Sequence, residues 1–366
     1  MSDSEGESHV RSAGAHSRGE AESHKRQMFN NPTSTLTTIG EGAFRNCTGL
    51  TTLTLPGSLT TVSKHAFRGA KGLTALSFPN SLITIGEGAF RECSGLTTVT
   101  LPDALTAVGL GAFDRCKSLT AITLPVSLTT TGECTFSECA GLTTLTLPGA
   151  LTTIGDRAFF DCKGLTALTL PDSLTTIGVQ AFFGCNLTAL TLPNSLTTIG
   201  DRAFFGCNLT VLTLPNSLTT IGDEAFFGCD DLTALTLPDS LTTIGIKAFF
   251  QCNGLTALTL PNSLRTIGVS AFMLCTGLTG LTVPDSMTTI GDGAFDSCTG
   301  LTTLTLPDSL TTIGEYTFWE CAGLTTLTLP DQLTTIGQHA FGGCNRLTSL
   351  TLPHKLINVD KFAVGN

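Results

Sequence analysis

Prolines recur along this chain at a nearly constant interval, and that interval constrains the fold more than any other feature. Fourteen of the 15 prolines follow Leu, Val or Phe, in steps of 23 residues apart from two steps of 22. They are Pro56, Pro79, Pro102, Pro125, Pro148, Pro171, Pro193, Pro215, Pro238, Pro261, Pro284, Pro307, Pro330 and Pro353. Both shorter steps lose a Gly from one loop, which can shorten without disturbing a strand. A period of this length indicates stacked repeats rather than separate globular domains.

The repeat itself reads L-T-x-L-T-L-P-x-S-L-T-T-I-G-x-x-A-F-x-x-C-x-G. Alternation of Leu and Thr, as over residues 53–55, predicts a strand with one buried face. The proline that follows ends the strand because it has no N–H to donate. A second short extended piece is expected over residues 59–62. After the Gly, the spacing of Ala, Phe and Cys predicts one helical or 3₁₀ turn that points Phe and Cys inward.

About eight apolar side chains in each repeat point to one side, and no 23-residue unit can bury them alone. Stacked copies, about 4.8 Å apart, would cover one another and form parallel strands. The sequence therefore predicts one solenoid of about 14 repeats of 22–23 residues, stabilised mainly by contacts between neighbouring repeats.

The strand signature L-x-x-L-x-L is that of leucine-rich repeats. Together with L-P-x-S-L-x-x-I-G-x-x-A-F-x-x-C, it resembles the BspA-like leucine-rich repeat family over residues 34 to about 364. The resemblance implies a leucine-rich-repeat solenoid, a β-rich right-handed horseshoe or superhelix. The best-known members of that family are cell-surface adhesion proteins of bacteria and protists. Where commoner leucine-rich repeats carry an Asn ladder, ten repeats here carry Ser, so we expect Ser hydroxyls to hold the turn.

The two ends of the chain differ from the repeats. Residues 1–33 are polar and predict a disordered N-terminal tail, and residues 34–366 form the repeat domain. That domain includes a C-terminal capping half-repeat in which Leu356, Val359 and Phe362 echo core positions. The first 31 residues contain no apolar stretch of the kind a secretory signal needs. The expected location is cytoplasmic or otherwise intracellular, or the cell surface if a leader is missing from this sequence.

Charge and hydropathy limit the partners of the chain. A net charge of −10 and a pI near 5.0 argue against binding to nucleic acid, which requires a basic face. No run approaches the roughly 20 apolar residues that span a bilayer, so membrane insertion is not expected. The expected partner is therefore a protein, whose identity is unknown.

Thirteen of the 14 cysteines occupy one repeat position, and Ala70 fills it in the second repeat. Small residues at one position favour a reduced ladder of buried thiols, which in turn favours a reducing compartment. The alternative is a series of disulfides between neighbours, although parallel side chains would lie alongside one another rather than face each other. C-x-x-C pairs and partnering histidines are missing from the sequence, so no metal or other cofactor is expected.

A second Phe directly follows the core Phe in five successive repeats, and Met and Trp hold the same place later. These residues are Phe160, Phe183, Phe205, Phe227, Phe250, Met273 and Trp319. Adjacent residues of one turn cannot both point fully inward, so the five Phe should form a partly exposed stripe roughly 20 Å long. Exposed apolar patches often mark partner sites, which makes these residues candidates for binding. The alternative is that they fold back over the flank as extra core.

The sequence points to a non-enzymatic protein-interaction scaffold. The histidines are scattered, and carboxylates such as Asp172 and Asp239 lie on an open turn, without a catalytic arrangement. A surface adhesin or antigen of the BspA-like type is the alternative. A structural or ice-binding solenoid is a further reading, because Thr fills the outward strand position in 13 of 14 repeats, although both outward positions are Thr in only five.

Overall fold

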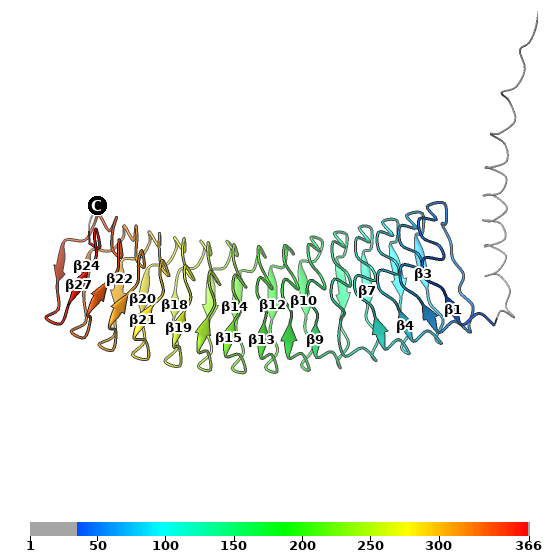
Figure 1. Cartoon of the computed structure of the whole chain (residues 1–366), viewed down its shortest axis with the longest axis horizontal. Helices are drawn as coiled ribbons and strands as arrows, with labels where there is room; N and C mark the ends of the chain where they lie inside the picture. Colours follow the sequence, from blue (N-terminus) through cyan, green and yellow to red (C-terminus); the bar gives the residue numbers. More distant parts are fainter. Residues whose placement is uncertain (1–34, 365–366) are drawn as a thin grey trace, which may run out of the picture.

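Each repeat forms one turn of a parallel-strand solenoid, and the stacked turns build a gently arched rod (Figure 1). The structure, a computed structural model, describes residues 35–364, so the predicted tail over residues 1–33 lies outside the described part. Equivalent residues of successive repeats pair in register, as Thr176 does with Thr198 and Ala167 with Ala189. The shared apolar column predicted from the sequence is therefore present.

Two strand series run along the rod, and each series pairs only with its own kind. The longer strands, called the long-strand series here, are β3 (Ala75–Ser77), β5 (Thr98–Thr100), β7 (Ala121–Thr123), β8 (Thr144–Thr146), β10 (Ala167–Thr169), β12 (Ala189–Thr191), β14 (Val211–Thr213), β16 (Ala234–Thr236), β18 (Leu258–Thr259), β20 (Gly280–Thr282), β22 (Thr303–Thr305), β24 (Thr326–Thr328) and β26 (Ser349–Thr351). Their middle Leu, Val or Ile faces the core and their outer residues face solvent, as in Ala167–Thr169. They begin one residue earlier than the Leu-Thr-Leu alternation predicted.

The second strand series follows the proline turn, and each of its strands has two residues. They are β1 (Thr38–Ile39), β2 (Thr61–Val62), β4 (Thr84–Ile85), β6 (Ala107–Val108), β9 (Thr153–Ile154), β11 (Thr176–Ile177), β13 (Thr198–Ile199), β15 (Thr220–Ile221), β17 (Thr243–Ile244), β19 (Thr266–Ile267), β21 (Thr289–Ile290), β23 (Thr312–Ile313), β25 (Thr335–Ile336) and β27 (Asn358–Val359). The Ser of the turn before them donates its hydroxyl to a carbonyl of the preceding repeat, as Ser195 does to Leu174 at 2.6 Å. Ten such bonds confirm the predicted Ser ladder.

The predicted helical or 3₁₀ turn is wrong for the described residues, 35–364, which contain no helix. The Ala-Phe segment forms overlapping four-residue turns, in which the two residues flanking Ala-Phe-x have positive φ, as at Arg202 and Gly206. Every second N–H then points to the next repeat: Phe204 donates to the Ala225 carbonyl and Gly206 to that of Phe227, both at 2.8 Å. A helix would keep these bonds within one repeat. Positive φ costs a non-Gly residue about 1–2 kcal/mol. These bonds between repeats form a third backbone ladder, in addition to those of the two strand series, and they offset that cost.

Phenylalanine dominates the core. The core rings of neighbouring repeats stack from Phe44 to Phe341 with centroids 5.0–5.6 Å apart. Nearly parallel equivalent rings measure the local distance between repeats. That distance is 5.3–5.5 Å along the core column from Phe159 to Phe249 but only 4.5–4.8 Å along the second Phe of the same repeats. The second Phe rings therefore stand closer together than the core rings do.

The last half-repeat departs from the sequence alignment. Phe362 does not occupy the core Phe position: it is exposed, has positive φ and stacks on His339 at 5.3 Å. Ala363 is buried and accepts the backbone bond from Phe341, so Val364 takes the place of the core Phe. The core Phe position of this half-repeat therefore lies two residues after Phe362, the residue predicted for it, because the capping segment lacks the Ala-Phe pair.

Candidate functional site

Five second phenylalanines form one continuous surface feature, which we call the aromatic stripe: Phe160, Phe183, Phe205, Phe227 and Phe250. All five rings are half-buried. Each stacks on the next with centroids 4.5–4.8 Å apart and ring planes within 14°. Such spacing is that of offset-stacked aromatic rings.

The aromatic stripe arises because adjacent residues of the turn point to opposite sides. Phe204 is fully buried in the core column, whereas its neighbour Phe205 emerges on the flank. This separation agrees with the argument that both rings cannot point inward. Because the rings stack along the rod, Phe183, Phe205 and Phe227 each have both faces covered by neighbouring rings. What they present outward is ring edge.

One border of the aromatic stripe is charged, and glycines occupy the centre of the other. On the first border Arg202 makes a two-point contact with Glu224, Nε–Oε2 at 2.9 Å and NH2–Oε1 at 3.0 Å, and the Lys247 ammonium lies 5.8 Å from the Phe250 ring centroid. On the second border Gly184, Gly206 and Gly228 follow the stripe rings directly. A Cβ at Gly206 or Gly228 would meet no atom within 4 Å, whereas one at Gly184 would lie 3.0 Å from Oδ1 of Asp161.

The later aromatic candidates belong to a separate cluster. Met273 is half-buried in the repeat after Phe250, but the next repeat places a buried Asp296 at the same position. Beyond it, Trp319 lies against Gly342, and its ring meets that of His339 edge-on at 4.8 Å. Tyr316 stacks on His339 at 5.1 Å and meets Trp319 edge-on at 5.8 Å. The structure thus brings five of the seven predicted residues into one stack, places Met273 half-buried at the equivalent position of the next repeat, and places Trp319 apart.

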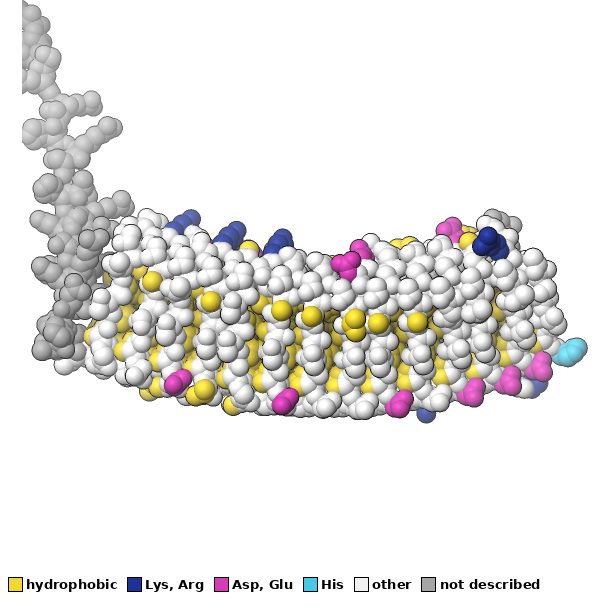
Figure 2. All heavy atoms as spheres, turned by 180° about the vertical axis from the view of Figure 1, so that it is seen from behind, with side chains coloured by type: hydrophobic (Ala, Val, Ile, Leu, Met, Phe, Trp, Pro, Cys, Tyr) yellow, Lys and Arg dark blue, Asp and Glu magenta, His cyan; other side chains and the backbone are white. Residues whose placement is uncertain are grey.

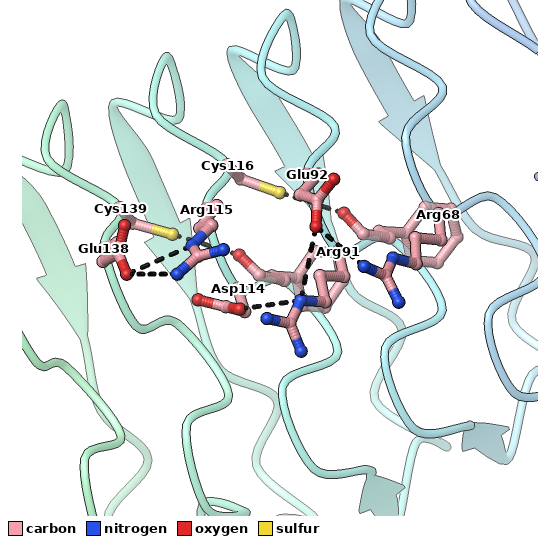
Figure 3. A network of polar contacts seen from close by, with 10 residues as sticks. Arg68, Arg91, Glu92, Asp114, Arg115, Cys116, Glu138 and Cys139 are labelled. Carbon is pink, nitrogen blue, oxygen red and sulfur yellow. Dashed lines mark hydrogen bonds and ion pairs between the residues drawn. The ribbon is translucent and has the colours of Figure 1, made fainter. Parts of the chain in front are cut away.

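Before the aromatic stripe, the same flank carries ion pairs (Figure 3). This charged ladder comprises Arg68, Arg91, Glu92, Asp114, Arg115 and Glu138. Arg68 binds Glu92 at 3.0 Å, and Arg115 binds Glu138 at 2.9 Å. Arg91 lies 3.1 Å from Asp114, whose side chain is buried. Burial raises the pKa of the Asp114 carboxyl, and the Arg91 guanidinium opposes that shift. These residues were not among the predicted site residues, although they recur at two adjacent repeat positions, directly after the core Phe and one residue later.

The long-strand series presents a different surface. Its outward residues are Thr, Ala, Ser, Val or Gly, and charged side chains gather along the two long edges of this face (Figure 2). A shallow groove of about 870 Å³ crosses β12, β14 and β16. The carboxylates after the prolines, including Asp172 and Asp239, are exposed along one edge as predicted. In the centre, Ala189, Val211 and Ala234 take one of the two outward positions, so the regular double Thr array is interrupted.

The cysteines form a ladder of free thiols. Twelve of them are buried, and each donates a hydrogen bond to the carbonyl of the core Phe in the preceding repeat. Burial raises the pKa of the Cys229 thiol to about 12. Cys47, at the first repeat, and Cys134, outside the column, are only half-buried.

Side-chain clusters that could hold a metal ion and helices that could cross a bilayer are both absent from the described residues. No group of three or more His, Cys, Asp or Glu side chains there could hold a metal ion. His65 and His339 lie in different repeats, and His354 is exposed. Within residues 35–364 no helix has the length and apolar character needed to cross a bilayer.

Comparison with known proteins agrees with this architecture. Residues 25–106, 64–185, 152–279 and 266–366 match the model of the BspA type leucine rich repeat region. A leucine-rich repeat protein from Bacteroides ovatus is 30% identical, with 83% of this chain and 82% of that one covered and a TM-score of 0.73. A leucine rich cell surface protein from Faecalibacterium prausnitzii is 26% identical, with 79% and 82% covered and a TM-score of 0.52. No curated protein matches the sequence.

Proposed function

Because the chain belongs to the BspA-type leucine-rich repeat family, we propose that it is a non-enzymatic scaffold that binds a protein partner through the aromatic stripe. Met273 extends this surface by one repeat. Repeat solenoids offer long surfaces to partners. In this chain three backbone hydrogen-bond ladders and a stacked aromatic core hold neighbouring repeats together beneath that surface.

The observation that carries the proposal is the half-burial of five stacked rings on one flank of the rod. Apolar surface that stays partly exposed in the free protein gains free energy when a partner removes it from water. The geometry also selects the kind of partner. Nucleobases, sugars and cations bind aromatic rings through their faces, and three of the five stripe rings have both faces covered. Exposed ring edges favour an apolar protein surface, which packs against them without stacking.

The test compares two sets of variants of the full chain in a capture experiment from the native cell. The first replaces Phe183, Phe205 and Phe227 by Ser. The second, a matched control on the long-strand face, replaces the exposed Thr191 and Thr213 by Lys. We expect the first set to lose the partner that the unmodified chain captures, and the control to retain it. Retention by the first set and loss by the control would contradict the proposal and assign binding to the long-strand face. Circular dichroism checks that both sets remain folded.

A cell-surface adhesin is the second candidate, because the Faecalibacterium prausnitzii relative is described as a cell surface protein. An intracellular location is supported by the ladder of free thiols, since reduced cysteines persist in a reducing compartment. Localising the tagged full-length protein by accessibility to an external protease separates the two. Cleavage on intact cells favours the adhesin, and protection favours the intracellular scaffold.

A further inference from the structure

The aromatic stripe stops abruptly at its N-terminal end. In the two repeats before Phe160, the stripe position holds Asp114 and Ser137, both buried and much smaller than Phe. The neighbouring turn position is also small there, Gly111 and Cys134. Together they leave a depression of about 420 Å³, which we call the gap, between the charged ladder and the aromatic stripe.

One wall of the gap is an aromatic face. Phe160 stacks on Phe183 on one side only, and it lines the gap with its other side. Phe160 therefore offers a ring face to an open space, which Phe183, Phe205 and Phe227 do not. Beside it the Arg157 guanidinium is held in place, because its Nε donates to Oε1 of Gln180 at 2.6 Å. Each step of the stripe is 4.5–4.8 Å, so one further step from Phe160 falls above Ser137.

The opposite wall and the floor are polar. The Asp114 carboxylate and the Ser137 hydroxyl lie among the gap residues, and the Ser137 hydroxyl opposes the rise in the Asp114 pKa that burial causes. Asp114 is paired with Arg91 at 3.1 Å, and Glu138 is paired with Arg115 at 2.9 Å (Figure 3). A cationic side chain entering the gap would find these two carboxylates already compensated. A neutral group that donates one hydrogen bond would find acceptors without disturbing a pair.

We propose that the gap is an anchor pocket for one aromatic side chain of the partner that carries a polar hydrogen, Tyr or Trp. Its ring stacks on the free face of Phe160 as the next step of the stripe, and its O–H or N–H donates to Asp114 or Ser137. Aromatic residues with a polar tip are common anchors at the centre of protein interfaces. This inference rests on the proposed function, because it supplies the anchor of the same surface.

The first test needs no partner. The probe is N-acetyl-L-tryptophanamide, titrated into the full chain and followed by ligand-observed NMR, with N-acetyl-L-leucinamide as the matched aliphatic probe. Ser137→Phe fills the gap with a residue that five other repeats carry at that position, and Ser137→Ala removes only the hydroxyl. We expect at least tenfold weaker tryptophanamide binding in Ser137→Phe and near-native binding in Ser137→Ala. Equal binding of the two probes, or unchanged binding in Ser137→Phe, would overturn the inference.

A second measurement locates the probe and does not depend on the fold of a variant. Cys134 lines the gap and is half-buried. In the unmodified chain, tryptophanamide should slow the alkylation of Cys134, read by mass spectrometry, and leave that of Cys47 unchanged. Equal rates at Cys134 with and without the probe contradict occupancy of the gap.

The partner assay separates this inference from the proposed function. Partner loss in both Ser137→Phe and the stripe variants supports the anchor. Partner loss in the stripe variants alone rejects the anchor and leaves the scaffold proposal standing. Tryptophanamide binding in the gap, with partner capture unaffected by the stripe variants, instead supports a ligand pocket and rejects the stripe as the partner site.

Discussion

The thiol of Cys207 donates a hydrogen bond to the carbonyl oxygen of Phe182, 3.4 Å away in the preceding repeat. Twelve cysteines repeat this contact along the rod. The Phe carbonyl also accepts a backbone bond from the Cys of its own repeat, as Cys185 donates to Phe182 at 3.2 Å. The cysteine column therefore joins neighbouring turns through the backbone, in addition to filling the core.

The thiol ladder predicts a loss of stability at high pH. Burial raises the pKa of Cys229 and of Cys275 from 9.0 to about 12. Below pH 8 both folded and unfolded chains hold neutral thiols, so stability does not depend on them. Between pH 9 and 12 the unfolded chain loses protons that the folded chain keeps, and stability falls by up to about 1.4 kcal/mol per pH unit for each thiol.

Urea unfolding at pH 7, 9 and 10 checks this dependence. The double variant Cys229→Ala, Cys275→Ala is the comparison, since Ala already fills the same position at Ala70, which is fully buried. Above pH 9 the unmodified chain should lose stability faster than the variant, by up to about 3 kcal/mol per pH unit. Identical slopes for the two proteins would show that the thiols are not buried in neutral form.

Thiol labelling should divide the cysteines into two groups. Cys47 and Cys134 are half-buried, whereas the twelve ladder thiols are buried, and burial also raises the pKa of these thiols. Because the thiolate is the reactive form, we expect iodoacetamide to modify Cys47 and Cys134 in the native protein and the remainder only after unfolding. Native protein whose ladder thiols are blocked as disulfides would contradict the reduced ladder.

The glycine after the two-residue strand should resist substitution. A Cβ at Gly222 would lie 2.7 Å from the backbone nitrogen of Asp201 and from the carbonyl carbon of Gly200 in the preceding repeat. Gly222→Ala must therefore push two repeats apart, at a cost of about 1–3 kcal/mol. Gly149→Ala is the control: its Cβ would meet nothing within 4 Å, and other repeats place Asp172 and Asn194 at this position. Equal shifts of the thermal midpoint in both variants would refute the close approach.

Much of this architecture could be predicted from the repeat alone. The period fixed the register, because only equal positions can share an apolar column, and the pairing of Thr176 with Thr198 confirms it. The Ser ladder and the outward direction of the second Phe followed from residue type and spacing. These features depend on residues that recur at one position, so the sequence displays them directly.

The conformation of the Ala-Phe turn could not be predicted in this way. Its positive-φ positions carry residues as different as Asn46, Arg115 and Glu138, so no side chain signals them. The conformation is selected by acceptors in the next repeat, which a local pattern does not contain. In the sequence the gap is marked only by two successive small residues, Asp114 and Ser137, between the larger Arg91 and Phe160 of the same column. Its depth depends on Gly111 and Cys134 beside them, which the structure brings together.

The free energies of unfolding of Phe204→Ala and Phe205→Ala test the central claim most directly, because these adjacent rings lie in the core column and the aromatic stripe. Truncating the buried Phe204 should cost about 3–5 kcal/mol. Truncating the half-buried Phe205 should cost less than about 2 kcal/mol, since much of its ring edge already meets water. Equal costs would show that the stripe is additional core and would contradict its role as a surface for a partner.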